Sequence, residues 1–154
     1  MKLSSRCTYA IRAMFDIAFH GNEQPIAGRE IAHREDIPQR FLEQILLQLR
    51  KAELVISRRG PAGGYLLARE ADEITFFDIV DAIDGLIEMD DLPSADELDQ
   101  GNEIASKQVT SLVWTDIAER IRTQMRSETL GDMVKRAEKL RVYREGAETL
   151  YYVI

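Results

Sequence analysis

The sequence predicts a mainly α-helical protein with one small β-hairpin, arranged as a winged helix-turn-helix head followed by a long dimerisation helix. Three observations predict this class. Residues 39–51 repeat apolar side chains at helical spacing, residues 58–64 form an arginine- and glycine-rich turn between two short apolar runs, and residues 109–125 keep an i, i+4 apolar stripe over about five turns. A helix of that length needs a partner surface for its stripe.

Charge divides the chain into three parts. The 154 residues carry a formal net charge of −7, yet residues 1–69 have a net charge of +4, and residues 70–106 hold 13 acidic residues and no lysine or arginine. The basic part coincides with the helix-turn-helix pattern, as expected if that part meets nucleic acid. The expected organisation is a DNA-binding head over 1–85, an acidic loop over 86–106, and a dimerisation helix with a C-terminal helix and tail over 107–154.

The first three helices are expected to form the head. Ser4 or Ser5 can cap a first helix that ends near Gly21. A second helix over 28–35 is followed by a tight turn, and Pro38 then opens the third helix, where its missing N–H costs nothing. Two short helices joined by such a turn form a helix-turn-helix. The buried stripe of the first helix is expected to be Ala10, Ala13, Met14, Ile17 and Ala18.

The third helix combines an apolar stripe with a polar edge. The stripe is core in any interpretation, so only the polar edge bears on function. Arginine can bind guanine bidentately, glutamine can bind adenine, and glutamate can accept from the amino group of cytosine. The expected stripe is Phe41, Leu42, Ile45, Leu46 and Leu49. The residues expected to contact DNA are Pro38, Gln39, Arg40, Glu43 and Gln44.

A hairpin wing is expected after the third helix, with strands at 55–57 and 65–67. Two arginines enter its glycine-rich turn, where missing Cβ atoms let the backbone approach a phosphate or a minor groove. The residues expected to make these contacts are Arg58, Arg59, Gly60, Gly63 and Gly64, supported by Lys2 and Arg6 from the start of the chain.

Two Thr-x-x-Asp capping boxes, at 75–78 and 129–132, predict the starts of two further helices. The first is expected to end at Gly85 and the second to run through Leu140, with a tail over 143–154. Residues 86–106 show no apolar period, so order is expected to resume at about Gln108. The helix that starts there is expected to pair with its copy in a homodimer through Val109, Leu112, Val113, Ile117 and Ile121.

The sequence also argues against several function classes. No nucleophile-and-base motif or phosphate-binding loop points to an enzyme. No apolar run is long enough to cross a membrane, and the first residues lack the apolar core of a signal peptide, so a cytoplasmic protein is expected. Cys7 is the one cysteine; it excludes an internal disulfide framework and is a candidate for redox sensing.

Metal binding has two alternative locations in the sequence. Carboxylates of the acidic loop could hold a divalent cation, although their order does not match a calcium loop. Those carboxylates are Asp90, Asp91, Asp96 and Asp99. The two histidines, His20 and His33, are isolated and are more typical of helix surfaces than of a metal site. We therefore expect no metal-binding residues in this chain.

Five segments in order carry a resemblance to a known family: MKLSSRCTYAIRAMFDIA, FLEQILLQLRKAELV, RRGPAGGYLLA, ITFFDIVDAID, and WTDI with TLGDMV. The chain resembles the IscR-type (Rrf-type) family of bacterial transcription regulators across nearly its whole length. The resemblance implies a homodimer with a winged helix-turn-helix head that binds double-stranded DNA at a pseudo-palindromic operator. It also implies, for several members, a 2Fe–2S cluster held by three cysteines in the loop before the dimerisation helix.

This sequence departs from the family pattern in that loop. No cysteine lies between Glu88 and Gln108, so no iron–sulfur cluster of the family type is expected, and no other cofactor is. A small molecule or protein effector at the acidic loop, or oxidation of Cys7, remains as an input. A second interpretation, from another class, is a protein-interaction module built on a winged-helix scaffold that no longer binds DNA. Arg58 and Arg59 favour the DNA-binding interpretation.

Overall fold

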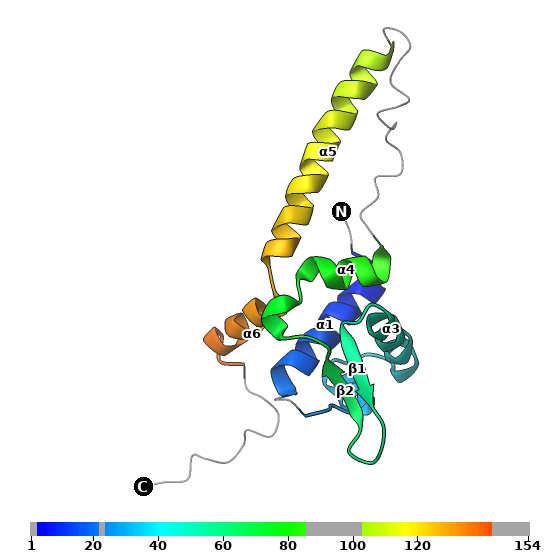
Figure 1. Ribbon diagram of the computed structural model, residues 1–154, viewed down its shortest axis with the longest axis vertical. Coiled ribbons are helices and arrows are strands. Elements are labelled where there is room, and N and C mark those ends of the chain that lie inside the picture. Colours follow the sequence, from blue (N-terminus) through cyan, green and yellow to red (C-terminus); the bar gives the residue numbers. More distant parts are fainter. Residues whose placement is uncertain (1–2, 22–23, 86–102, 143–154) are drawn as a thin grey trace.

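The computed structural model describes residues 3–21, 24–85 and 103–142. One long helix, α5, projects from a head built by the other helices and a two-stranded hairpin (Figure 1). This architecture confirms the predicted fold class. The elements are α1 (Ser5–His20), α2 (Gly28–Arg34), α3 (Gln39–Lys51), β1 (Val55–Arg58), β2 (Gly64–Leu67), η1 (Ala71–Glu73), α4 (Phe76–Asp84), α5 (Glu103–Ser127) and α6 (Leu130–Lys139).

Helix α1 is the centre of the head, and it packs against α2, α3, α4, α6 and β2. Ser4, not Ser5, is its N-cap, because the Ser4 hydroxyl accepts the Cys7 N–H at 3.0 Å. The expected apolar stripe is buried except for Ala18, which is half-buried against the core. Buried side chains from α3, β1, α4 and the residues just before β1 and α4 complete the same core: Leu42, Ile45, Leu46, Leu49, Leu54, Val55, Ile74 and Ile79.

Two ion pairs fix α1 to the helix-turn-helix. Arg34 of α2 binds the carboxylate of Asp16 with two hydrogen bonds of 2.8 Å, and Asp16 is only 1% exposed. Arg12 donates to the Glu35 side chain at 2.9 Å and also to the Glu35 carbonyl, at the end of α2. The next residue, Asp36, has φ of 47°, the left-handed conformation that lets the chain turn into α3. The two bridges therefore hold the turn that sets the angle between α2 and α3.

The hairpin is antiparallel, with Val55 paired to Leu67 and Arg58 paired to Gly64. Each strand is longer than expected, because the ladder includes Arg58 and Gly64. A further bridge joins Tyr65 to Ile26, with hydrogen bonds of 2.8 and 3.0 Å between their backbones. This isolated bridge fixes the segment before α2 beside the two-stranded wing.

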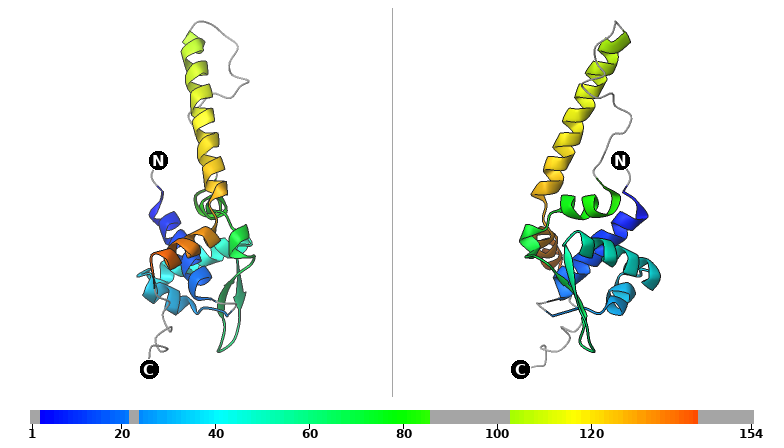
Figure 2. Two further views of the ribbon diagram at one scale, coloured as in Figure 1. Left: turned by 90° about the vertical axis from the view of Figure 1, so that its left-hand side faces the viewer. Right: turned by 45° about the vertical axis from the view of Figure 1, so that its right-hand side comes forward.

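The long helix begins at Glu103, five residues before the expected start. The apolar period that predicted Gln108 is missing from residues 103–107, yet their composition still suits a helix. This end of α5 lies far from the head in all three ribbon views, so no apolar face is required there (Figures 1 and 2). The helix ends at Ser127, and the predicted capping boxes at Thr75 and Thr129 start α4 and α6.

Within the described ranges, no helix combines the length and the apolar character that crossing a membrane would require.

Candidate nucleic-acid interface

The polar edge of α3 is exposed along its length. Gln39, Arg40, Glu43 and Gln44 all face solvent, and Gln39 Nε2 donates to Glu43 Oε1 at 3.0 Å. Pro38 is the N-cap rather than the first helical residue, and its carbonyl accepts the N–H groups of the first turn. The four side chains thus start from the exposed N-terminal half of a helix whose other face is locked in the core.

One residue of the predicted apolar stripe is not core. Phe41 is 43% exposed, and its ring meets Tyr9 edge-on, with centroids 6.2 Å apart. The helical period places Phe41 with the buried leucines, but it lies in the first turn, where the head covers only one side of it. The sequence prediction was wrong about its burial.

Leu47 was not singled out from the sequence. It is 43% exposed, and it lies one turn beyond Glu43 and Gln44 and one turn before Lys51, all of which face solvent. Its exposure could have been found from the helical period, because position 47 does not belong to the stripe formed by 42, 45, 46 and 49.

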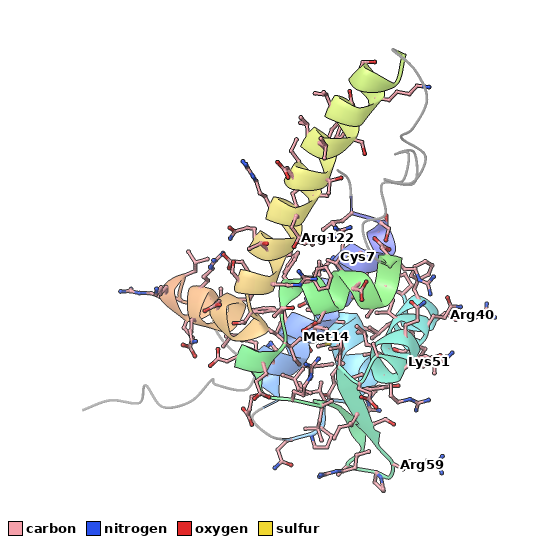
Figure 3. All side chains as sticks on the ribbon, turned by 45° about the horizontal axis from the view of Figure 1, so that its top comes forward. Cys7, Met14, Arg40, Lys51, Arg59 and Arg122 are labelled. Carbon is pink, nitrogen blue, oxygen red and sulfur yellow. The ribbon has the colours of Figure 1, made fainter. Side chains whose placement is uncertain are left out.

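The wing carries its two arginines at the end of the hairpin. Arg58 and Arg59 are both exposed. Arg40 and Lys51 of α3 and Arg59 of the wing point outward on the same side of the head (Figure 3). Arg50 Nη1 donates to Ser57 Oγ at 3.3 Å, which ties the end of α3 to β1. The helix and the hairpin therefore present one basic face.

Glycine is required at the three predicted wing positions for different structural reasons. Gly60 has φ of 111° and nothing within 4 Å of an added Cβ, so it serves the turn and faces open space. A Cβ on Gly63 would collide with the Arg58 carbonyl, and one on Gly64 would collide with the Ile26 carbonyl. Internal packing is thus sufficient to explain Gly63 and Gly64, whether or not they also approach DNA.

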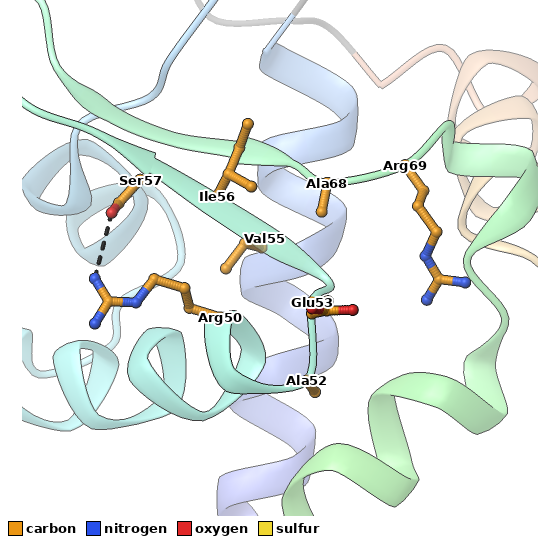
Figure 4. A pocket seen from close by; sticks show the side chains of 8 residues that line it. All are labelled: Arg50, Ala52, Glu53, Val55, Ile56, Ser57, Ala68 and Arg69. Carbon is orange, nitrogen blue, oxygen red and sulfur yellow. Dashed lines mark hydrogen bonds between the residues drawn. The ribbon is translucent and has the colours of Figure 1, made fainter.

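A groove of about 820 Å³ separates the end of α3 from the hairpin (Figure 4). It opens to solvent, and the Arg50–Ser57 hydrogen bond crosses one side of it. Arg69 on the other side lies 3.8 Å from the carboxylate of Asp78. Each guanidinium group thus already has one protein partner, a hydroxyl for Arg50 and a carboxylate for Arg69.

The start of α1 lies away from the wing (Figure 1). Ser4 donates from its backbone and hydroxyl to Asp84, with the hydroxyl bond at 2.6 Å, which fixes the start of α1 beside the end of α4. The hairpin turn lies at the opposite end of the head (Figures 1 and 2). Arg6, in the first turn of α1, therefore is not a neighbour of Arg59, and Lys2 lies outside the described residues.

Cys7, in the same turn of α1 as the Ser4–Asp84 contact, is fully buried. Its side chain is 0% exposed, and burial, with a smaller contribution from the Asp84 charge, raises the pKa of the thiol from 9.0 to about 11. The reactive form of cysteine is the thiolate. This environment disfavours the hypothesis that Cys7 is a redox sensor.

The metal-site alternatives find no support in the described part of the chain. There, no group of three His, Cys, Asp or Glu side chains is arranged to hold a metal ion. His20 Nε2 lies 3.8 Å from Asp16, and His33 is exposed on α2. The four loop carboxylates, Asp90, Asp91, Asp96 and Asp99, lie outside the described residues.

The predicted dimer stripe is exposed over the half of α5 that projects from the head. Leu112 is 67% exposed and Ile117 is 38% exposed, with Val109, Val113 and Trp114 between these values. Ile121 differs, because it packs partly against the core of its own head, next to buried Met125. The free apolar face thus covers residues 109–117.

This geometry has counterparts among known proteins. The family model Rrf2, described as an iron-dependent transcriptional regulator, matches residues 3–136. The chain belongs to the Rrf2 family. The HTH-type transcriptional regulator IscR of Sodalis glossinidius (strain morsitans) is 35% identical over 142 residues, which span 92% of this chain and 84% of that protein. IscR of Xenorhabdus nematophila is 36% identical over the same shares.

Solved structures of two regulators have the same fold. IscR of T. potens is similar with a TM-score of 0.73 and 35% identity, over 94% of this chain and 93% of that one. CymR, the global cysteine regulator of B. subtilis, is similar with a TM-score of 0.71 and 31% identity, over 88% and 98%. The predicted resemblance is therefore confirmed, and transcriptional regulation is the activity of the Rrf2 family.

A cluster ligated by three cysteines does not fit this member of the Rrf2 family. Its one cysteine, Cys7, is enclosed in the core of the head with a raised pKa, whereas a cluster ligand must be a deprotonated thiolate. Residues 88–108 supply oxygen and nitrogen groups but no cysteine sulfur. Oxygen donors suit hard cations and are poorly matched to a site built for thiolate.

Proposed function

We propose that this Rrf2-family protein is a sequence-specific DNA-binding regulator that acts as a homodimer at a pseudo-palindromic operator, without a cysteine-ligated iron–sulfur cluster. The observation that carries this proposal is the shared basic face: the polar edge of α3 and the arginine-bearing end of the wing point to the same side of the head. A recognition helix and a hairpin so arranged can occupy a major groove and the adjacent backbone of one duplex.

Helix α3 supplies the base contacts in this proposal. Arg40 offers a bidentate donor for guanine, Glu43 an acceptor for the amino group of cytosine, and Gln44 a pair of groups for adenine. Pro38 and Gln39 lie at the very start of the helix, and the hydrogen bond from Gln39 restrains the Glu43 carboxylate before DNA arrives. A restrained side chain loses less entropy on binding.

The wing supplies contacts to the phosphates or to the minor groove. Arg58 is held in the hairpin ladder opposite Gly64, and Arg59 follows it at the turn, where Gly60 leaves open space. Arg6, in the first turn of α1, would reach a different stretch of backbone, and Lys2, outside the described residues, stays a proposed contact. Contacts to phosphates add affinity but carry no sequence information.

The homodimer in this proposal forms through the projecting half of α5. A second copy of the chain is the occupant that matches an apolar stripe on a helix, since two such stripes are complementary by symmetry. Residues Val109, Leu112, Val113 and Ile117 form the centre of the interface, and Ile121 marks its edge at the head. Two heads joined in this way present two copies of α3 to one face of a duplex.

In this proposal the regulator responds to a signal other than an iron–sulfur cluster. The acidic segment 86–106 occupies the position of the family's cluster loop, so a small molecule or a protein effector acting there is the input we propose. Most of that segment lies outside the described residues. Its charge matches a cationic ligand better than an anionic one.

Selection from a randomised duplex library with the purified protein tests the proposal. We expect enrichment of a two-fold symmetric sequence, and we expect Arg40→Ala or Glu43→Ala to lose about 1–3 kcal/mol of discrimination at one base position in each half-site. If the protein neither enriches a sequence nor shifts random duplex at low salt, it is a protein-interaction module on a winged-helix scaffold instead.

A further inference from the structure

Leu47 is an exposed apolar side chain in the middle of the polar face of α3. Its neighbours one turn away on that face are Glu43, Gln44 and Lys51, all exposed. Leu47 itself is 43% exposed and does not belong to the core or to the half-buried residues packed against it. The apolar contacts of α3 with the head come instead from Leu42, Ile45, Leu46 and Leu49.

A single exposed leucine is ordinary on a protein surface. The position of Leu47 distinguishes it, because it lies between the proposed base-reading residues and the end of the same helix. It follows Glu43 by one turn, a rise of about 6 Å along the axis, so a helix that brings Glu43 to a base edge carries Leu47 to a neighbouring base pair. Water leaves such a side chain when the groove receives the helix.

Only one base offers an apolar group to a side chain in the major groove. Thymine presents its C5-methyl group there, while the edges of the other bases present hydrogen-bond donors and acceptors. We propose that Leu47 packs against a thymine methyl group and specifies thymine at one position of each half-site, next to the position contacted by Glu43 or Gln44. This inference rests on the proposed DNA-binding function and adds a base preference that the polar residues do not provide.

Replacing thymine by deoxyuridine removes this methyl group and leaves the other groups of the base edge unchanged, so it isolates the contact. The probe is the duplex enriched by the wild-type protein, with each thymine of the half-site replaced singly by deoxyuridine. At one position we expect the wild type to lose about fourfold in affinity per half-site, as burial of one methyl group predicts. The Leu47→Ala variant should bind the unmodified duplex at least fourfold more weakly than the wild type does. It should bind the unmodified and the deoxyuridine duplex with equal affinity.

Leu140→Ala is the matched control, because Leu140 is 78% exposed at the end of α6, away from α3. It should leave both affinities at the wild-type values. Circular dichroism and thermal melting of each variant check that the fold is intact; an exposed leucine should change neither by much.

The outcomes separate the inference from the function beneath it. If the wild type enriches a sequence but distinguishes thymine from deoxyuridine nowhere, or if Leu47→Ala keeps the full methyl effect, the assignment of Leu47 is wrong while the proposed function stands. If the wild type enriches no sequence and binds no duplex, the proposed function fails and takes this inference with it.

Discussion

Thr75 and Thr129 pair in an isolated antiparallel bridge, although they lie far apart in the sequence. Each threonine is also the N-cap of a helix, and each capping box is complete. The carboxylates of Asp78 and Asp132 accept hydrogen bonds from the backbone N–H groups of Thr75 and Thr129. The flanking backbone bonds, Phe76 N–H to the Glu128 carbonyl and Leu130 N–H to the Ile74 carbonyl, are both 2.8 Å. The starts of α4 and α6 are thus fixed to each other, and α5, which ends just before, leaves the head at a fixed point.

Thr129→Ala should lower the free energy of unfolding by about 1 kcal/mol, because the alanine leaves the Asp132 N–H without the hydroxyl that accepts it at 3.1 Å. Thr129→Ser keeps a capping hydroxyl and should recover most of that loss. Urea denaturation measures both values. Equal stabilities for the alanine and serine variants would show that the cap does not stabilise the junction.

Asp16→Ala should destabilise the protein by about 3 kcal/mol, because it removes the buried carboxylate that binds the Arg34 guanidinium, whose own side chain is 14% exposed. Arg12→Ala removes a more exposed bridge, in which the Arg12 side chain is 42% exposed, and should cost about 1 kcal/mol. Chemical denaturation compares the two variants. A smaller loss for Asp16→Ala than for Arg12→Ala would mean that the buried ion pair is not the stronger of the two.

Cys7 should resist thiol reagents in the folded protein up to high pH, because burial raises its pKa from 9.0 to about 11. The unfolded chain loses the thiol proton near pH 9 and the folded chain near pH 11, so this group stabilises the fold below pH 9 and its contribution disappears between pH 9 and 11. Labelling with iodoacetamide at about pH 8, below the ordinary thiol pKa, with and without denaturant, checks this. Rapid labelling of the native protein would restore Cys7 as a candidate sensor.

Arg59→Ala should weaken binding and, if the contact is a phosphate, do so by a similar factor on all duplexes and reduce the slope of log K against log salt by about 1. Arg141→Ala is the control, because Arg141 is an exposed arginine beyond α6. Fluorescence anisotropy at several salt concentrations gives both slopes. Identical affinity and slope for Arg59→Ala and the wild type would mean that the wing does not touch DNA.

Ile117→Glu should separate the proposed homodimer, because it would place a charge within the apolar face through which the two helices are proposed to pair. Thr115→Glu places the same charge about 200° around the same helix and should leave the dimer intact. Sedimentation velocity distinguishes the two states. If Ile117→Glu remains a dimer, the subunits meet through another surface.

Local sequence pattern was enough to predict part of the fold. The helical period identified α3, and the threonine and aspartate spacings identified the starts of α4 and α6, because capping is a contact within four residues. The packing of Phe41 and Gly64 was not predictable in this way. Phe41 is exposed because only Tyr9 of α1 contacts its ring and the other side of the ring faces solvent, and Gly64 is required by a carbonyl from residue 26.

In the candidate interface, too, local features were predictable from the sequence and contacts between distant segments were not. The exposed edge of α3 follows from helical spacing, so Arg40 and Glu43 could be named from the sequence. The separation of Arg6 from Arg59 depends on how α1 crosses the head, where Ser4 meets Asp84 across 80 residues of chain. Local pattern contains no information on such a crossing.

Hydroxyl-radical footprinting of the enriched duplex tests most directly whether a dimer joined through α5 places two heads on one operator. Two protected segments related by a two-fold axis, with centres about one helical turn apart or a multiple of it, are expected for the wild-type protein. A single protected segment, or uniform protection along the duplex, would contradict the proposal of two α3 helices reading two half-sites.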